Sequence, residues 1–507
     1  MAIQSAAKNT ITNWLNILVT SILSFIVRDF LIRYLGADIL GVDATIIETL
    51  NLLSLSELGI QTSISYKMYK PIIDKDTTRQ RELFNLFKVA YRIVGIVIFV
   101  IGLGLLPLLD SIVNTTIDMR IVYTAYLLQL IVISISYFTS YYRILFLTYQ
   151  KQYICTQFDI FLGILGLTLQ IIILYFTHNY IMYLCYSYIH VFTQYFFIAS
   201  KARREFPDVV RKIGIKSEDI KELISDLKEL IVGSVAGYLY GSTDNILLSV
   251  FFGSITTGLV SNYKMITQLM RRIISSANAA VGPTWGDFLY RTDDNKTVEK
   301  YYDAFIFFEF CACLVLLAPT VVLCDKFILL WLGEEFIVQR VVMWLIIADI
   351  FCSCINEPSC VLIRNLGLFK QEKKVSIIAS IVNLVLSYLL AKYIGIAGIF
   401  AGTLCAVFVF WVMRSYYVNK TCFAGSMQSY LRFWKNNFVY VFTFIALCVL
   451  ASHAISKLQI SNGIIELFVG GIISELLVVI VLIVFWKRTT SFQLITSKFM
   501  YILMRKK

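Results

Sequence analysis

Charge, proline and histidine are scarce in this sequence, and each shortage excludes a class of protein. Only 15% of the 507 residues are charged, whereas 58% are hydrophobic and the mean hydropathy is +0.74. Soluble domains carry a larger share of charge, so a set of soluble domains is excluded. With 6 prolines, and 25 glycines scattered without a repeat, the sequence also lacks the composition of a long flexible linker or a disordered tail.

Few residues suit metal binding or nucleic-acid binding. The 3 histidines are isolated, and the 11 cysteines fall mostly in apolar runs. The closest cysteines, Cys311 with Cys313 and Cys352 with Cys354, have a single residue between them, which is too close for a zinc knuckle. The net charge of +12 comes from short basic segments between long apolar runs, which is typical of membrane-protein loops. We therefore expect no metal, no cofactor, no catalytic residue and no nucleic-acid partner.

Long apolar runs dominate the chain. A membrane-spanning helix needs about 20 mostly apolar residues. Fourteen segments qualify: 11–33, 39–66, 85–109, 119–141, 157–176, 179–200, 229–252, 256–282, 302–324, 337–363, 375–393, 395–417, 437–456 and 464–486. The first run continues into a full span without a small-residue cleavage site, so we expect no cleavable signal. The sequence predicts an all-α polytopic membrane protein of about 14 transmembrane helices.

Lysine and arginine mark alternate loops, which indicates the cytoplasmic side. They gather at 67–84, 201–228, 291–300 and 370–374 and in the tail after 486. We therefore expect both termini to be cytoplasmic. The predicted parts are a six-helix lobe at 1–200, a cytoplasmic linker with an amphipathic helix at 201–228, a second six-helix lobe at 229–420, and two last helices with a tail at 421–507.

The two predicted lobes have the same orientation, as parallel repeats do. Gly36 and Gly41 lie five residues apart between the first and second spans, and Gly253 and Gly258 do the same between the seventh and eighth. Glycine permits the backbone angles of a tight reversal. These matched turns favour an internal repeat.

Polar residues follow a helical period in five spans. Such residues are costly inside a membrane and normally face a cavity or a partner helix, and a spacing of three or four places each set on one helix face. The first span has Asn13, Asn16, Thr20, Ser24 and Arg28; the second has Glu48, Asn51, Ser54, Glu57, Gln61 and Ser65; the seventh has Ser234, Tyr238, Ser242, Asn245 and Ser249; the eighth has Ser261, Lys264, Gln268, Arg271, Arg272, Ser275 and Asn278; the tenth has Asp349, Ser353, Asn356, Glu357 and Arg364.

Four of these stripes occupy equivalent places in the two halves and predict a water-filled central cavity. Four of its six charged residues are basic, so we expect an anionic ligand, and arginine suits phosphate because its planar fork donates two parallel hydrogen bonds. The predicted substrate-binding residues are Arg28, Lys264, Arg271, Arg272, Gln268, Asn245 and Asn16, and the candidates for coupling to H⁺ or Na⁺ are Glu48 and Glu57.

A structural role is the alternative for some of these charges. Arg28, Glu48 and Glu57 could pair with one another to hold the first two helices together, and Asp29 could neutralise the adjoining Arg28. Arg272 could point to a lipid headgroup. The basic residues of the eighth span have no acidic residue on their own helix to pair with. This favours a role in lining the cavity over a structural role.

The run from Arg33 to Gly41 (RYLGADILG), followed by LSLSELGI at 53–60, resembles the polysaccharide-transporter family. These are the oligosaccharide-unit flippases of the multidrug/oligosaccharidyl-lipid/polysaccharide exporter superfamily. The similarity in amino-acid sequence is specific over about the first 70 residues. Over the whole chain, the length, the number of spans and the distribution of charge agree with the family.

The resemblance implies two six-helix lobes forming a V around a cationic cavity. It also implies transfer of an undecaprenyl-pyrophosphate-linked oligosaccharide across the bacterial cytoplasmic membrane by alternating access, for a surface polysaccharide such as O-antigen or capsule. The implied partners are this carrier-linked glycan, membrane lipids, and a glycan polymerase with other assembly proteins. In the related lipid II flippase, basic residues of the first and eighth helices line the cavity, and Arg28, Lys264, Arg271 and Arg272 stand at the corresponding spans here.

Two other functions fit less well. A cation-coupled multidrug exporter of the same superfamily usually takes cationic substrates, which a net basic cavity disfavours. A membrane-embedded glycan polymerase or ligase needs a catalytic group on a sizeable outer loop, and the predicted outer loops are short. We therefore expect a transporter that is not an enzyme.

Overall fold

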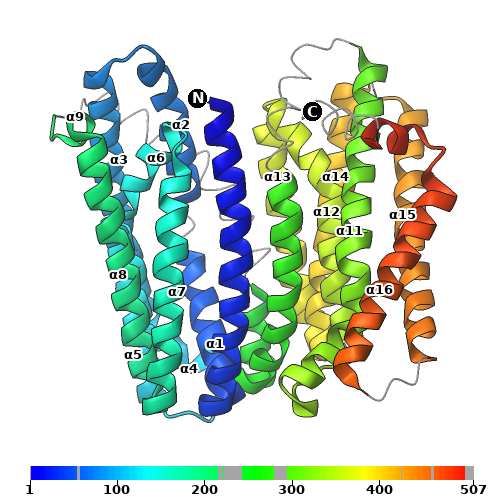
Figure 1. Ribbon diagram of the computed structural model, residues 1–507, viewed down its shortest axis with the longest axis horizontal. Helices are drawn as coiled ribbons and strands as arrows, with labels where there is room; N and C mark the ends of the chain where they lie inside the picture. The colour runs from blue at the N-terminus through cyan, green and yellow to red at the C-terminus, as the bar shows by residue number, and fades with distance from the viewer. Residues whose placement is uncertain are drawn as a thin grey trace. The chain divides into compact units, whose positions relative to one another are not determined.

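The computed structural model describes residues 2–53, 57–214, 220, 243–278, 294–423, 425–457 and 462–496. Every regular element among these residues is a helix, which confirms the predicted all-α fold (Figure 1). The chain divides into two compact units, residues 1–261 and 262–507. The finer domain boundaries expected from the sequence stay a prediction.

The first unit contains nine labelled α-helices and the first part of a further helical stretch within its described residues. They are α1 (Ala2–Leu53), α2 (Glu57–Ile73), α3 (Thr77–Leu105), α4 (Leu109–Ile112), α5 (Met119–Ser136), α6 (Arg143–Thr148), α7 (Gln152–Thr177), α8 (Tyr180–Glu205) and α9 (Pro207–Val210), followed by the stretch Thr243–Asn278, which runs on into the second unit. Along one side of the unit α1 packs against α7, and α7 against α8 (Figure 1).

A break at Gly36 divides α1. The backbone of this residue (φ 82°, ψ 171°) is not helical. Near the start of α1, Asn9 donates a hydrogen bond to the carbonyl of Gln150, between α6 and α7. Just after the break, Asp38 accepts one from the Thr115 hydroxyl, before α5. The first part of α1 therefore crosses the unit from one end to the other.

The chain then returns to its starting end. At the beginning of α3, Gln80 accepts a hydrogen bond from the Tyr149 hydroxyl at 2.5 Å, beside the residues that Asn9 contacts. Lys151 forms an ion pair with Glu205 at the same end. The second part of α1 together with α2 therefore crosses back, as the predicted turn at Gly36 requires.

The second unit holds six further labelled α-helices among its described residues. They are α11 (Asn295–Trp331), α12 (Arg340–Asn365), α13 (Phe369–Ile394), α14 (Ile396–Cys422), α15 (Met427–Ser456) and α16 (Gly463–Val481), which continues as a π-helix over Leu482–Trp486. α14 packs between α12 and α13, and α11 packs against α12, α15 and α16 (Figure 1). The ring of Phe310 stacks on Tyr440 with centroids 4.4 Å apart, joining α11 to α15.

Capping side chains begin many of these helices. The free N–H groups of a first turn need an acceptor, which Asp, Asn or Ser supplies. Side-chain oxygens of Asp76, Asp118, Asn179, Asp294, Ser426 and Asn462 accept from backbone N–H groups at the starts of α3, α5, α8, α11, α15 and α16. Hydrogen bonds from the Thr297 hydroxyl and the first-turn amides hold the pKa of Asp294 below its ordinary value.

Eleven helical stretches in the described part of the chain are long and apolar enough to cross a membrane. Two of these stretches each overlap two predicted spans. Ile11–Leu53 contains the first span and about half of the second, and Thr243–Asn278 contains the end of the seventh and most of the eighth. α8 covers nearly all of the sixth predicted span but is not among the eleven, because tyrosine and polar residues such as His190 and Gln194 lower its hydropathy. Most of the seventh span and the amphipathic helix expected at the linker lie outside the described residues. The number fourteen therefore stays a prediction.

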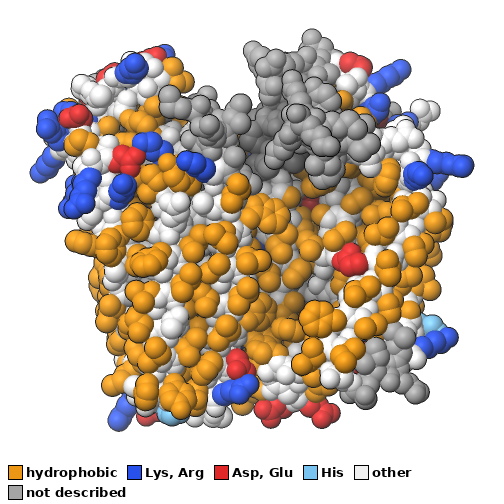
Figure 2. Space-filling model, in the orientation of Figure 1, with side chains coloured by type: hydrophobic (Ala, Val, Ile, Leu, Met, Phe, Trp, Pro, Cys, Tyr) orange, Lys and Arg blue, Asp and Glu red, His pale blue; other side chains and the backbone are white. Residues whose placement is uncertain are grey.

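The side chains of both units follow the same pattern. Figure 2 shows hydrophobic side chains covering the sides of the helices, whereas lysine and arginine gather near helix ends. Large apolar residues such as Phe442 on α15 and Phe468 on α16 are about three-quarters exposed, at 74% and 72%. Such exposure suits a lipid-facing surface and would be rare on a soluble protein.

Candidate functional site

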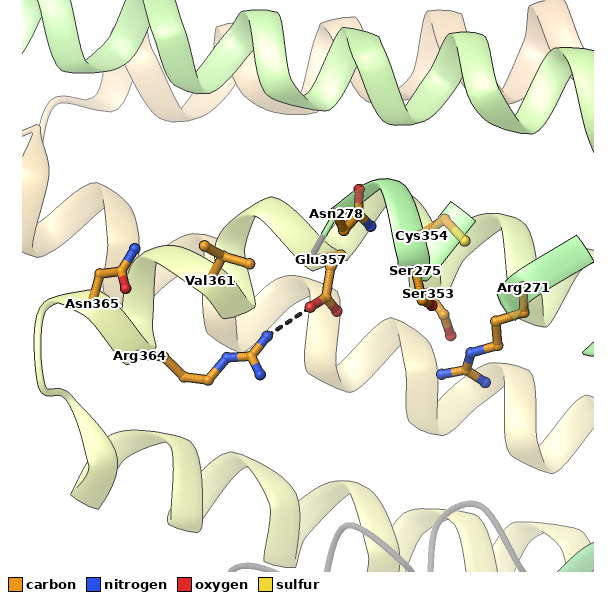
Figure 3. Close-up of a pocket in the computed structure, with 9 residues that line it drawn as sticks. All are labelled: Arg271, Ser275, Asn278, Ser353, Cys354, Glu357, Val361, Arg364 and Asn365. Carbon is orange, nitrogen blue, oxygen red and sulfur yellow. Dashed lines mark hydrogen bonds and ion pairs between the residues drawn. The ribbon is translucent and has the colours of Figure 1, made fainter. Parts of the chain in front are cut away.

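A polar cavity of about 390 Å³ lies within the second unit, between the end of the stretch Thr243–Asn278 and α12 (Figure 3). This volume is in the range of small-ligand sites, ~300–1,000 Å³. We call it the arginine pocket. Its lining residues are Arg271, Ser275, Asn278, Ser353, Cys354, Glu357, Val361, Arg364 and Asn365.

Helical spacing brings these residues to one cavity. Arg271, Ser275 and Asn278 are four and three residues apart, so they share a face of their helix. On α12, Ser353 and Glu357 share a face in the same way. The pocket therefore forms where the polar stripe of the eighth predicted span meets that of the tenth.

A proline shapes the α12 wall. Pro358 lies inside α12 and has no N–H to donate, so the carbonyl of the pocket residue Cys354 has no helical partner. The hydroxyl of Ser353 and the amide of Asn365 also line this wall. Together they give the pocket acceptors and donors that suit hydroxyl-rich ligands.

Three charges dominate the pocket. Arg364 donates from Nη2 to Glu357 Oε1 at 2.6 Å, and these two residues lie seven positions apart on α12. Figure 3 shows Arg364 turned toward Glu357, with Arg271 on the far side of Glu357. Two guanidinium groups and one carboxylate leave the pocket with a formal charge of +1.

Two buried polar side chains lie near the pocket. Oδ1 of Asn278, which lines the pocket, has no hydrogen-bond partner among the described residues. Glu309 on α11 is fully buried, and its carboxylate interacts with Asn278, Cys354 and Glu357. It was not among the residues predicted from the sequence, although a single glutamate inside an apolar predicted span was a signal for it.

The other predicted residues of the eighth span lie outside the arginine pocket. The Lys264 ammonium lies 5.4 Å from the ring centroid of Phe400 on α14, a cation–π distance. Gln268 and Arg272 are exposed and are not part of the pocket lining. Of the four predicted residues of this span, Arg271 lines the arginine pocket, and a shared cavity for all four stays a prediction.

Arg28 has its own surroundings in the first unit. Its Nη2 donates to the Ser261 hydroxyl, and the guanidinium interacts electrostatically with Asp43. The neighbouring Asp29 instead pairs with Arg33, one helical turn away, at 2.9 Å. The carboxylate of Asp29 is thus paired with Arg33.

The remaining predicted residues also lie in the first unit. The Asn245 amide is 3.5 Å from Glu48 Oε1, at the limit of a hydrogen bond. Oδ1 of Asn16 is buried without a hydrogen-bond partner among the described residues. The side chain of Glu57 lies outside the described residues, so its part in ion coupling stays a prediction.

Two polar clusters in the first unit were not predicted from the sequence. Asp43 accepts hydrogen bonds from Gln129 at 2.8 Å and from the Tyr180 hydroxyl at 2.7 Å. Arg143 forms two bonds with Asp159, at 2.7 and 3.0 Å. Their partners come from different helices, so the helical period of a single span does not reveal them.

The sequence over residues 6–288, more than half of the chain, matches a family model described as polysaccharide biosynthesis protein. This chain belongs to that family. The match confirms the kinship inferred from the runs at 33–41 and 53–60. Among curated proteins, no match to the sequence was found.

Solved structures show which fold this family member adopts. An inward-facing multidrug resistance MATE family transporter of the MOP superfamily is similar, with a TM-score of 0.63, 14% identity, and coverage of 81% of this chain and 98% of that chain. The lipid II flippase MurJ in an inward closed conformation also has a TM-score of 0.63, with 11% identity and coverage of 92% and 98%.

A MOP superfamily transporter from Pyrococcus furiosus is similar too, with a TM-score of 0.56, 14% identity, and coverage of 82% and 96%. Identities this low establish the fold alone. The chain is therefore a multi-pass membrane protein of the polysaccharide biosynthesis family with the fold of MOP superfamily transporters and flippases.

Proposed function

We propose that this protein moves undecaprenyl-pyrophosphate-linked oligosaccharide units across the bacterial cytoplasmic membrane, and that the arginine pocket holds the pyrophosphate. The observation that carries this proposal is the pair Arg271 and Arg364 in one cavity of the second unit. Cations inside membrane helices are costly unless an anion compensates them. A guanidinium fork matches phosphate oxygens better than any other side chain does.

The position of the pocket supports uptake from the cytoplasm. It lies where α12 ends at Asn365 and α13 begins at Phe369. The lysines at 370–374 mark this end as cytoplasmic by the positive-inside rule. Undecaprenyl-linked glycans are assembled on that side, so the charged group enters the site there.

The size and polarity of the pocket support a charged headgroup with a sugar attached. A volume of about 390 Å³ accommodates the phosphates and the nearest sugar, whereas a longer oligosaccharide extends beyond it. Ser275, Asn278 and Asn365 offer hydrogen bonds to sugar hydroxyls. The polyprenyl chain remains in lipid, since its transfer to water is strongly unfavourable.

Two comparisons add weight. The family concerns polysaccharide biosynthesis, and one structural neighbour is a lipid II flippase. Transport then proceeds by alternating access, with Glu48 and Glu57 as candidates for coupling to H⁺ or Na⁺. O-antigen or capsule assembly, with a glycan polymerase acting afterwards, is the proposed context.

The experiment is complementation of a host that lacks its own glycan flippase. Surface glycan is measured at matched membrane expression for the wild type, Arg271→Ala and Arg364→Ala. A hydrogen bond to a charged group contributes about 1.5–3 kcal/mol, so each variant should lose roughly 10-fold or more of the transport rate.

Arg340→Ala is the matched control. Arg340 is an exposed arginine at the start of the same helix and is not part of the pocket lining, so its removal should leave surface glycan unchanged. If Arg271→Ala and Arg364→Ala restore glycan as well as the wild type does, the pocket is not the site. If the wild type confers drug resistance and moves no glycan, the multidrug-exporter function replaces this one.

A further inference from the structure

We propose that Glu357 is a built-in counter-anion: it pairs with Arg364 in the arginine pocket until the pyrophosphate of the substrate displaces it. This inference rests on the proposed function, because it concerns the same pocket and the same ligand. It adds Glu357 as a residue that controls which anions bind the pocket and how fast the substrate is released. Glu357 is acidic although the ligand is an anion.

The Glu357–Arg364 pair is built loosely. A single hydrogen bond of 2.6 Å joins the two side chains within the described part of the chain. The side chains are 35% and 53% exposed. Arginine has five N–H donors, so most of the guanidinium remains available to a ligand.

A second pair in the same unit shows what a structural ion pair looks like. Arg414 on α14 contacts Glu372 on α13 through two nitrogens, one of them at 3.1 Å. These side chains are only 14% and 20% exposed. That pair joins two helices, whereas Glu357 and Arg364 both belong to α12 and their bond holds no two helices together.

Exchange at Arg364 therefore needs only side-chain movement. Glu357 and Arg364 lie two helical turns apart on one helix, and they separate by rotamer changes while α12 stays in place. A pyrophosphate brings more charge than a carboxylate and can engage the guanidinium through two parallel bonds. It replaces the single bond to Glu357 with a stronger contact.

Glu357 also penalises weaker ligands. A neutral glycolipid or a singly charged headgroup cannot compensate Arg364 better than Glu357 does, so the carboxylate keeps its place and repels other anions. After transport, Glu357 competes with the phosphate for Arg364 and speeds release. The same charge thus lowers affinity and raises turnover.

Binding of farnesyl pyrophosphate and farnesyl monophosphate to the purified full-length protein tests this inference. We expect Glu357→Gln to bind the pyrophosphate about fivefold more tightly, the effect of removing one partly exposed competing ion pair. The preference for pyrophosphate over monophosphate should narrow. In the complementation assay the same variant should transport more slowly despite its higher affinity.

Two further variants separate exchange from a structural role. Glu299→Gln removes the partner of Arg432, an ion pair of the same unit outside the pocket lining, and should leave both affinities unchanged. In an Arg364→Ala background, Glu357→Gln should lose its effect, because Glu357 acts through Arg364. If Glu357→Gln does not give a monodisperse protein, Glu357→Asp takes its place, since it withdraws the carboxylate from Arg364 and should also tighten binding.

The outcomes are distinguishable from failure of the proposed function. If Arg364→Ala weakens pyrophosphate binding while Glu357→Gln weakens it or leaves it unchanged, the counter-anion is refuted and the anion site stands. If Arg271→Ala and Arg364→Ala both bind pyrophosphate like the wild type, the pocket is not an anion site and both proposals fail. If Glu357→Gln also tightens pyrophosphate binding in the Arg364→Ala background, Glu357 does not act through Arg364 and the proposed exchange is refuted.

Discussion

Arg143 and Asp159 form an ion pair within the first unit. Two hydrogen bonds of 2.7 and 3.0 Å join α6 to α7. Gln194 on α8 donates to the same carboxylate, so three helices meet at one charge. Removal of one partner leaves the other charge uncompensated within a helical bundle, which costs more than the pair itself contributes.

Asp159→Ala should therefore lower stability. The side chains are 32% and 22% exposed, so we expect a loss of about 2 kcal/mol rather than the ~3–5 kcal/mol of a fully buried pair. This corresponds to a fall in the unfolding temperature of roughly 5 °C. Fluorescence-detected size-exclusion chromatography after heating, in detergent, measures it.

Arg33→Ala is the control for this prediction. Arg33 pairs with Asp29 within α1, and its side chain is 68% exposed. An exposed pair contributes ~1 kcal/mol or less, so this variant should melt close to the wild type. Equal unfolding temperatures for Asp159→Ala and the wild type would show that the Arg143 cluster does not hold the three helices together.

At the residue scale, the sequence allowed part of the site to be predicted. The helical period correctly placed Arg271, Ser275 and Asn278 on one face, because period alone decides which residues share a face. It did not separate Arg271 from Lys264, since the position of Lys264 beside Phe400 depends on how α14 packs. The place of Arg364 in the same pocket as Arg271 likewise depends on the contact between two helices.

At the scale of elements, two glycine turns pack against each other in the first unit. Gly36 and Gly253 both have positive φ, 82° and 83°. A Cβ on Gly41 would overlap the Ser254 carbonyl oxygen, and one on Gly258 would overlap that of Ala37. Gly41 therefore lets its helix approach Ser254 closely, and Gly258 does the same for Ala37.

Gly41→Ala should disrupt this crossing. Its methyl group would meet backbone atoms, which cannot rotate away as a flexible side chain can. Overpacking of this kind costs about 1–3 kcal/mol, so we expect a lower unfolding temperature and less folded protein at equal expression. Thermal unfolding in detergent, measured beside the wild type, gives the result.

Gly104→Ala is the matched control. Gly104 lies inside α3, and among the residues that the structure describes no atom lies within 4 Å of the position that the added methyl group would take. Alanine stabilises a helix interior by roughly 0.5–1 kcal/mol relative to glycine, so this variant should be as stable as the wild type or more so. A Gly41→Ala protein as stable as Gly104→Ala would mean that the turns can separate without cost.

The fold was more predictable than these contacts. Apolar runs located the helices from α11 to α16, because each run is bounded by charged or turn residues. The glycine spacing indicated both turns. It did not indicate that the turns cross, since packing between segments more than 200 residues apart depends on the tertiary fold. Helix ends shifted too: α11 extends to Trp331, because apolar and charged residues both continue a helix.

At the scale of the whole molecule, charge divides the first unit into two ends. The end where Lys151 pairs with Glu205 also contains Arg81, whose Nε donates to the carbonyl of Asp208. At the opposite end Asp38 accepts hydrogen bonds from Thr115 and Thr116. Figure 2 shows the concentration of Lys and Arg at the first end, where Figure 1 labels α9.

This asymmetry predicts the orientation in the membrane. Basic loops stay on the cytoplasmic side, so the end with α9 should be cytoplasmic and the end with Asp38 external, in agreement with a cytoplasmic N-terminus. Arg211→Cys and Arg120→Cys are a matched pair of exposed arginines at the two ends. A membrane-impermeant maleimide applied to intact cells should label Arg120→Cys and spare Arg211→Cys until the cells are opened.

The parent protein sets the background for this labelling, because it already holds exposed Cys185 and Cys405. Labelling above that background at Arg211→Cys alone would show that the orientation is the reverse of the predicted one. The basic end of the first unit would then lie outside the cell, against the positive-inside rule. Labelling at Arg120→Cys alone would place α9 and the basic end of the first unit on the cytoplasmic side, as the distribution of lysine and arginine predicts.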